Sequence, residues 1–301
     1  MAESRTEDWV RDAGGPGVRT GSFMPGRSYW LASLQANGKS ATTILSYDRD
    51  LEHVAVAVGG DCASHNRMTE FEQATIDNLA VEWEMAGLSR PTVLRRLSAL
   101  RSFAAYLCTH GVNCTRVLAA RLPHPIRKPR VALHEDDLDA LSAPMSEPKD
   151  MIEVRNRSIV VLQAEAGLTT GEIVGLDLAD LDLEERTISI ARTHLGPRAL
   201  RISHQALAPL AAYVTNFRGH APGPLFLSTS GSRLGARSIQ LLFRGLCRRS
   251  GVREAAGPSS VRHAIGIAFV DSGIALPVVA HAMGLTLGGA LRYLRTASRK
   301  P

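Results

Sequence analysis

Long apolar runs are missing from this sequence of 301 residues. No stretch approaches about 18 uninterrupted apolar residues, which excludes a conventional membrane-spanning helix. The first residues, MAESRTEDWVRDAGG, include acids and no apolar segment, so we expect no secretory signal. Four cysteines are too few for a disulfide scaffold in this length, and we expect a reducing cytoplasm. Aromatic residues are only 5%, which argues against a protein that binds single strands by base stacking.

Lysine is also scarce, although the chain is basic. Lys39, Lys128, Lys149 and Lys300 are the only lysines among the 35 lysines and arginines. The net charge of +6 suits a polyanionic partner, and the planar fork of arginine matches the geometry of a phosphate group. A GC-rich genome would produce the same excess of arginine, so the bias alone assigns no function.

Composition and periodicity divide the chain into four segments. Residues 1–28 are rich in Gly, Arg and Ser without periodicity, which indicates a basic arm. Residues 29–122 show helical spacing of apolar residues, and we expect a helical domain there. Residues 123–133 carry prolines and basic residues, which is typical of a linker between domains. Residues 134–301 form the second expected domain.

A cationic helix begins at Ser89 in the first expected domain. Ser89 is a capping residue, and Pro91 is permitted in the first turn of a helix. The residues that follow place one apolar stripe on the predicted helix. Its arginines are Arg90, Arg95, Arg96 and Arg101. Such a charged face is either simply solvated or a surface for phosphate contacts.

The second expected domain is mostly helical with one small sheet. Segments 187–191 and 199–203 read as two short strands of a hairpin around Gly196 and Pro197. Further helices are expected at 135–141, 159–166, 172–176, 205–217, 235–250, 259–273, 275–283 and 288–296. The predicted fold class is therefore mostly α with a small β-hairpin, in two domains.

Four sequence segments in this order resemble the tyrosine recombinase (phage integrase) family over residues 29–296. SRPTVLRRLSALRSFAAYL (89–107) resembles the last helix of the family's core-binding domain. RNRSIVVLQAEAGLTTGEIVGL (155–176) resembles the helix pair that carries the family's first arginine. SSVRH (259–263) lies where the family has His-x-Leu-Arg-His, and DSGIALPVVAHAMGL (271–285), followed by Tyr293, parallels the family's C-terminal motif.

The resemblance implies a specific chemistry. In the family a tyrosine attacks a DNA phosphodiester, two arginines bind the non-bridging oxygens, a lysine on the hairpin protonates the leaving oxygen, and histidines assist. The retained positions here are Tyr293, as nucleophile, and Arg262. The resemblance further implies a helical core-binding domain and an α+β catalytic-like domain that hold duplex DNA between them.

Other positions of the implied active site have lost their groups. Thr169 stands where the first arginine is expected, Ser259 replaces the first histidine, and Leu285 replaces the second. The segment between residues 187 and 203 contains no lysine. Each such loss costs roughly 10²–10⁴ in rate. We therefore expect a DNA-binding, recombinase-like protein with impaired catalysis, so whether it is an enzyme stays open.

Structural interpretations compete with the functional ones at each of these positions. Tyr293 can be a buried aromatic on a short helix, and Arg262 can form a surface phosphate contact or an ion pair. His263 can be a packing histidine, whereas His281 lies one helical turn before residue 285 and can replace the missing histidine. Thr169 can simply cap the helix that follows it.

The expected partner is double-stranded DNA, together with an active recombinase or a second copy of the chain. The residues expected to contact DNA are Arg90, Arg95, Arg96, Arg101, Arg127, Lys128, Arg130, Arg192 and His263. The cysteine and histidine spacings match no standard zinc module, so we expect neither a metal nor a cofactor. We expect a cytoplasmic protein on prokaryotic, phage or mobile-element DNA, with a role in integration or recombination as accessory factor or regulator.

Two alternative functions remain open from the sequence. One is an active site-specific recombinase that uses Tyr293 with Arg262, completed by residues of a partner subunit. The other is a helical protein-interaction module that no longer binds DNA. A salt-sensitive affinity for DNA separates this module from the recombinase hypotheses, because phosphate contacts make binding depend on salt. Covalent trapping on DNA separates the active enzyme from the impaired one.

Overall fold

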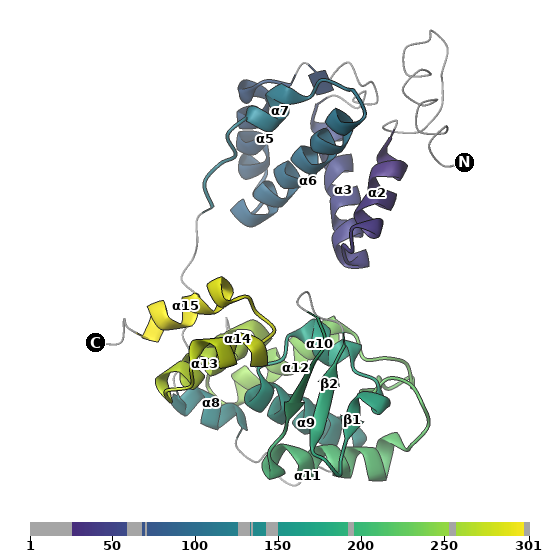
Figure 1. Cartoon of the computed structure of the whole chain (residues 1–301), viewed down its shortest axis with the longest axis vertical. Helices are drawn as coiled ribbons and strands as arrows, with labels where there is room; N and C mark the ends of the chain where they lie inside the picture. Colours follow the sequence, from purple (N-terminus) through teal and green to yellow (C-terminus); the bar gives the residue numbers. More distant parts are fainter. Residues whose placement is uncertain are drawn as a thin grey trace. The chain divides into compact units, whose positions relative to one another are not determined.

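The chain consists of two compact units (Figure 1). The computed structural model describes residues 26–58, 68–69, 71–125, 133, 135–142, 150–191, 196–252 and 257–297. Unit 1 is Met1–Lys128 and unit 2 is Pro129–Pro301, and each has its own hydrophobic core. Helices dominate both, and the strands of the described residues form one small sheet in unit 2. The predicted fold class, mostly α with a small sheet, is confirmed.

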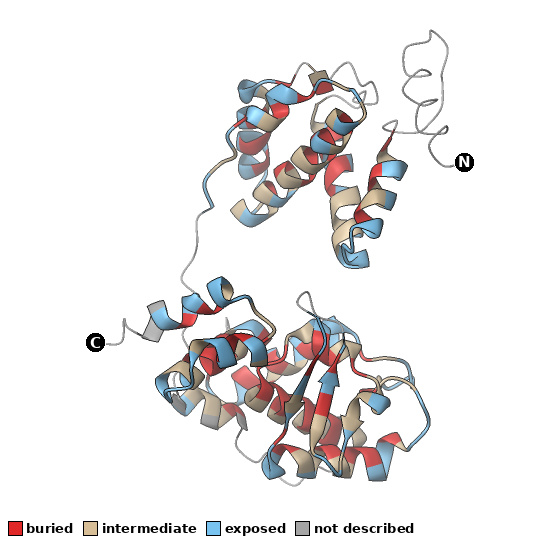
Figure 2. Cartoon of the chain, in the orientation of Figure 1, coloured by how far each residue is buried: buried red, intermediate tan, exposed pale blue. Residues whose placement is uncertain are grey.

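Unit 1 is built from helices that share one core. They are α2 (Arg27–Ala36), α3 (Ala41–Ala57), α5 (Gln73–Met85), α6 (Arg90–Thr109) and α7 (Thr115–Ala119). Trp30 is fully buried between Tyr47 and Phe103, with ring centroids 6.2 Å and 5.2 Å away. Figure 2 shows how buried positions recur along each helix, so that one side faces the core and the other faces solvent.

Helix α6 occupies the position that its capping sequence predicts. Ser89 is the N-cap residue and Pro91 lies in the first turn, while Val93, Leu97 and Phe103 are buried at helical spacing. The Ser89 hydroxyl bonds Thr92 Oγ1 at 2.9 Å and does not bond the backbone of the helix. Proline and the buried stripe therefore define this helix more than a side-chain cap does.

The start of α5 is set by Glu72. The apolar spacing of residues 71–85 after Thr69 predicts a helix that Thr69 caps, but the helix begins at Gln73 with Glu72 as N-cap residue. Glu72 and Thr75 form a reciprocal capping box, in which the Glu72 backbone N–H donates to Thr75 Oγ1 at 3.4 Å. A capping box satisfies two backbone donors at once and can therefore prevail over a single upstream threonine.

Unit 2 combines a small antiparallel sheet with helices. Its elements are α8 (Glu135–Ser142), α9 (Met151–Ala166), α10 (Thr170–Gly175), η1 (Leu178–Asp180), β1 (Leu181–Asp182), β2 (Thr187–Ile190), β3 (Arg198–Arg201), α11 (His204–Tyr213), η2 (Val214–Arg218), α12 (Ala236–Arg249), α13 (Pro258–Asp271), α14 (Leu276–Ala282) and α15 (Leu287–Ala297). The strand order is β1-β2-β3, and Ile190 pairs with Arg198. Ile188 and Ile190 are buried in the same core as residues of α9.

Two details of unit 2 correct the expectations. The sheet has three strands, whereas the sequence pattern predicted two. The additional strand, β1, was not predicted because it contains only two residues and is too short to show a periodic pattern. Helix α9 begins at Met151, not at Ile159, because Asp150 caps it by accepting a hydrogen bond from the Glu153 backbone N–H at 2.9 Å. The predicted apolar segment is only the second half of that helix.

The last three helices share a separate small core. It joins Ile267 of α13 with Val279 of α14 and Ala290 and Tyr293 of α15. These helices therefore fix the position of Tyr293 relative to α13. Across the described ranges, no helix combines the length and apolar character needed to cross a membrane.

Replacing Trp30 tests the packing of unit 1. Trp30→Ala removes the ring that Tyr47 and Phe103 contact, and we expect it to lower the free energy of unfolding of unit 1 by about 3–5 kcal/mol. Val56→Ala, at a position that is 72% exposed on α3, should change it by no more than about 0.5 kcal/mol. Urea unfolding followed by circular dichroism measures both. Equal midpoints for the two variants would contradict this packing.

Candidate functional site

Helix α10 begins with a capping box that positions Glu172. The Glu172 backbone N–H donates to Thr169 Oγ1 at 3.1 Å, and the Thr169 backbone N–H donates to Glu172 Oε2 at 2.7 Å. The Thr169 hydroxyl also donates to Glu172 Oε2, at 2.9 Å. Thr169 therefore caps the helix, as one of the interpretations proposed, and its side chain is committed to Glu172.

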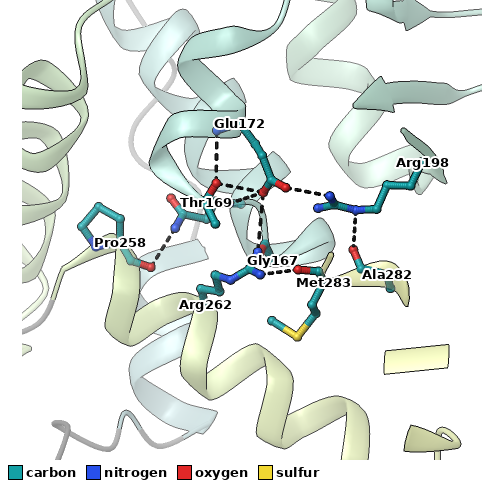
Figure 3. Close-up of polar contacts among 9 residues, drawn as sticks. Gly167, Thr169, Glu172, Arg198, Pro258, Arg262, Ala282 and Met283 are labelled. Carbon is teal, nitrogen blue, oxygen red and sulfur yellow. Dashed lines mark hydrogen bonds and ion pairs between the residues drawn. The ribbon is translucent and has the colours of Figure 1, made fainter. Parts of the chain in front are cut away.

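The Glu172 carboxylate forms an ion pair with an arginine of the sheet (Figure 3). Arg198, the first residue of β3, donates from Nη1 to Glu172 Oε1 at 2.6 Å and from Nε to the Ala282 carbonyl at 3.0 Å. The Arg198 side chain is only 2% exposed. The contact joins α10, β3 and the end of α14.

Arg262 on α13 approaches the same carboxylate from another side. Its Nη1 lies 3.6 Å from Glu172 Oε2, and it also donates to the Gly167 carbonyl. Its Nη2 donates to the Met283 carbonyl. Figure 3 shows the guanidinium between the end of α9, which Gly167 caps, and Met283. One carboxylate thus contacts two guanidinium groups.

The pKa values follow from this arrangement. Burial alone would raise the pKa of Glu172, but the hydrogen bonds from Arg198 and Thr169 outweigh it and hold that pKa below its ordinary value. Burial lowers the pKa of Arg262, against the opposing attraction of Glu172 and Tyr293. A guanidinium remains charged at any working pH. The cluster of Glu172, Arg198 and Arg262 therefore carries one net positive charge.

Tyr293 lies on α15 with its ring packed against α13. It is 2% exposed, and its ring centroid lies 5.4 Å from that of His263. Gly266 makes this packing possible, because a Cβ there would lie 2.6 Å from Tyr293 Cε1. The guanidinium of Arg292 lies 5.7 Å from the centre of the ring. Tyr293 is thus a buried aromatic that also lies within electrostatic range of Arg262.

The substituted positions supply no cationic or imidazole group to this cluster. Ser259 is exposed in the first turn of α13, and Leu285 packs partly against the core of α13, α14 and α15. His263 is buried beside Tyr293, in agreement with its interpretation as a packing histidine. His281 is exposed on α14 and lines a cavity together with Arg198 and Leu285.

Two arginines of α6 that we expected to contact DNA are bound to a buried acid. Arg95 Nη1 lies 2.7 Å from Asp50 Oδ2, and Arg96 Nε lies 3.9 Å from Asp50 Oδ1. The guanidinium of Arg96 also lies 5.0 Å from the ring centre of Trp83. Burial raises the pKa of Asp50, against the opposing charges of Arg95 and Arg96.

The other two arginines of α6 are engaged as well. Arg90 pairs with Glu84 and donates to the His124 carbonyl at 3.3 Å. Arg101 donates to the carbonyls of Leu118, at 2.5 Å, and Ala120, at 2.7 Å. DNA contacts by the four arginines of α6 remain predictions, and any phosphate would compete there with partners inside unit 1. Arg127, Lys128, Arg130 and Arg192 lie outside the described residues.

Helix α12 carries a different set of arginines. Its apolar face, with Ile239 and Phe243, is buried in the core of unit 2. Arg237, Arg244 and Arg248 are exposed on the opposite face at spacings of seven and four residues, and within the described ranges they form no ion pair. At 1.5 Å per residue they extend over about 16 Å. We call Arg237, Arg244 and Arg248 the α12 stripe.

Sequence reasoning missed Glu172, Arg198 and the α12 stripe. The Thr169-x-x-Glu172 pattern is a capping box and could have identified Glu172. Alternation along β3 could have identified Arg198, because Leu200 marks the inward face that residue 198 shares. The exposed basic face of α12 has a local signal in the helical spacing of its apolar residues, but its lack of acidic partners depends on other elements and has none.

Two of the described cysteines are buried core residues. Cys114 is buried in unit 1, where burial and the neighbouring Cys108 raise its pKa to about 11. Cys247 is likewise buried, in unit 2. Within the part of the chain that the structure describes, no three His, Cys, Asp or Glu side chains gather as metal ligands would.

Removing the charge of Glu172 tests the cluster. Glu172→Gln leaves two guanidinium groups without a counter-charge and should destabilise unit 2 by about 3 kcal/mol at neutral pH. Because the folded pKa of Glu172 is lowered, its contribution is complete above the ordinary value of 4.5 and disappears as the pH falls through the folded pKa. As the pH falls through that range, the melting temperatures of wild type and Glu172→Gln should therefore converge. Glu184→Gln, at an exposed acid, is the control, and a pH-independent difference for Glu172→Gln would contradict the assignment.

Comparison with known families confirms the resemblance seen in the sequence. The Phage integrase family matches residues 132–288, and the N-terminal SAM-like domain of phage integrases matches residues 28–111. Tyrosine recombinase XerC of Escherichia coli is 29% identical over 239 residues, which are 77% of this chain and 78% of that protein. XerC of Xanthomonas campestris is 28% identical over 247 residues, which are 81% and 75% of the two chains.

Solved structures share the fold. The Tn1549 transposon integrase in complex with a circular intermediate DNA has a TM-score of 0.71 and 17% identity, over 89% of this chain and 93% of that one. A lambda integrase dimer bound to a COC′ core site has a TM-score of 0.66 and 15% identity, over 91% and 77%. The catalytic-domain family match covers more than half of this sequence, and the chain belongs to the phage integrase family of tyrosine recombinases.

Proposed function

We propose that this protein binds duplex DNA in recombination or integration and that its own strand-cleavage centre is impaired. The observation that carries the proposal is that the Thr169 side chain is already hydrogen-bonded within the protein. Its hydroxyl caps α10 and binds Glu172, at the position where the family resemblance requires a guanidinium. Losing one such charged donor costs roughly 10²–10³ in rate.

The absence of the expected acid–base groups should lower the rate of strand cleavage further. Ser259 and Leu285 replace histidines, and residues 187–203 offer arginine but no lysine. A guanidinium is a poor proton donor, and loss of a general acid costs roughly 10²–10⁴ in rate. These losses are not additive, but together they leave little autonomous cleavage. Arg262 and Tyr293 are the retained members of the implied centre.

The α12 stripe is the DNA-contacting surface that we propose for unit 2. Its arginines have no acidic partner within the described residues, so a phosphate would replace only water. Their spread of about 16 Å lets one helix face contact several successive phosphates. The DNA in the Tn1549 and lambda integrase structures supports a nucleic-acid partner. The dimer of lambda integrase supports an active recombinase or a second copy as protein partner.

The salt dependence of DNA binding tests this surface. Replacing Arg244 and Arg248 together by Ala should make the slope of log K against log salt shallower by about 2, for a mixed-sequence duplex. Replacing Arg95 and Arg96 together by Ala is the comparison pair in unit 1, where Asp50 competes with any phosphate and a smaller change of slope is expected. If the slope becomes shallower for the Arg95 and Arg96 variant but not for the Arg244 and Arg248 variant, the DNA-contacting surface lies on unit 1 instead. Absence of any salt-sensitive binding by wild type would favour a protein-interaction module.

Covalent trapping tests the impairment. Tyr293→Phe should leave the affinity for DNA unchanged, because the hydroxyl makes no contribution to binding if the centre is inactive. Wild type and variant should both fail to form SDS-resistant complexes with nicked duplexes. A complex that forms with wild type and not with Tyr293→Phe would show an active recombinase and would overturn the proposal.

A further inference from the structure

A cavity of about 290 Å³ lies between β3 and α14. Arg198 forms part of its wall together with Gly284 and Leu285, and the exposed side chain of His281 also lines it. A water molecule takes up about 30 Å³ of liquid volume, so the cavity has room for a phosphate group and several waters. Leu285 is the position at which the implied active site would carry a histidine.

Arg198, which lines this cavity, has one unused donor. Its Nε and Nη1 are bonded to Ala282 and Glu172, but Nη2 is buried and has no hydrogen-bond partner among the described residues. A buried donor without a partner costs free energy and is rare in folded proteins. The unused N–H therefore leaves Arg198 able to donate to one further acceptor.

Gly284 leaves space for the Arg198 guanidinium because it has no side chain. A Cβ at residue 284 would lie 2.5 Å from Arg198 Nη1 and 2.9 Å from Cζ, closer than any real Cβ contact. The backbone at Gly284 is also left-handed, with φ of 57°, which favours glycine. The residue thus provides both the turn after α14 and the space for the guanidinium.

The charge of the cluster indicates the nature of that further acceptor. Arg198 and Arg262 contact the two oxygens of one carboxylate, at 2.6 Å and 3.6 Å, and so lie close to each other. One acid cannot neutralise two guanidinium groups, and the remaining positive charge favours an anion. Two neighbouring guanidinium groups match the non-bridging oxygens of a phosphate.

We propose that Arg198 supplies, from β3, the second phosphate-binding guanidinium of this site in place of residue 169. This inference rests on the proposed function, because the anion is a phosphate of the bound duplex. Arg198 and Arg262 bind that phosphate together, while Glu172 keeps both guanidinium groups oriented. The site then retains phosphate binding although the groups for proton transfer are lost.

Neutral phosphates test the contact in the full-length protein. A duplex recovered from random fragments by wild type is remade with each phosphate in turn replaced by an uncharged methylphosphonate. One replacement should weaken wild-type binding about tenfold or more, as loss of a charged hydrogen bond does. Arg198→Lys keeps the positive charge but loses the planar guanidinium that binds two oxygens. In this variant the same methylphosphonate replacement should weaken binding much less, because the contact that it removes is already lost. An unchanged profile for Arg198→Lys would overturn the proposal.

Two further variants separate phosphate binding from folding. Gly284→Ala keeps every charge but displaces the Arg198 guanidinium, so it should give the same altered profile as Arg198→Lys. Arg201→Lys, at an exposed arginine on the same strand, should keep the wild-type profile. Melting temperatures identify any variant that is unfolded.

Inorganic phosphate provides a test that does not depend on DNA. Phosphate should raise the melting temperature of wild type above its value in chloride at equal ionic strength, and the gain should be smaller for Arg198→Lys than for Arg201→Lys. Equal gains for the two variants would overturn the assignment of Arg198. If wild type retains no duplex but responds to phosphate through Arg198, the proposed function fails and the anion site stands.

Discussion

The buried carboxylate of Glu172 determines how the second unit is held together around its site. It binds Thr169 at the start of α10, Arg198 on β3 and Arg262 on α13, which are far apart in the sequence. The arginines in turn bind backbone carbonyls at the ends of α9 and α14. An anion that contacts two cations in a region with little water is strongly constrained. The arrangement of the groups that we propose to bind phosphate therefore depends on this one acid.

The same acid binds Thr169, at the position where the family resemblance implies the first arginine. At residue 169 the threonine hydroxyl bonds Glu172 and completes a capping box, which stabilises the helix but offers no charge to a ligand. Arg198 brings a guanidinium to the opposite side of the carboxylate and leaves one N–H unused. Under the proposed function the protein keeps the means to hold a phosphodiester, while residues 187–203 contain no lysine and Ser259 and Leu285 stand at the implied histidine positions. Tyr293, packed on Gly266, is part of the core of α13, α14 and α15.

Local patterns predicted most helices of the fold but few of the contacts in the site. The cap and apolar stripe of α6 are readable because the information lies within one turn or one face of the helix. Strand β1 is too short for such a pattern. The pairing of Glu172 with Arg198, or of Arg95 with Asp50, joins residues that are distant in the sequence, and no local rule indicates it. Helices α6 and α12 look equally cationic, yet the four arginines of α6 contact acids or carbonyls of unit 1, whereas the α12 stripe forms no ion pair among the described residues.

Sequencing of DNA recovered with the purified protein tests the central claim, which is that the site holds DNA without cleaving it. Genomic fragments are incubated with the protein, and the bound DNA is recovered in two pools, one under native conditions and one after SDS and heat. The account predicts enrichment of specific fragments in the native pool alone. Enrichment of the same fragments in both pools would demonstrate a covalent link through a tyrosine such as Tyr293 and would contradict the account.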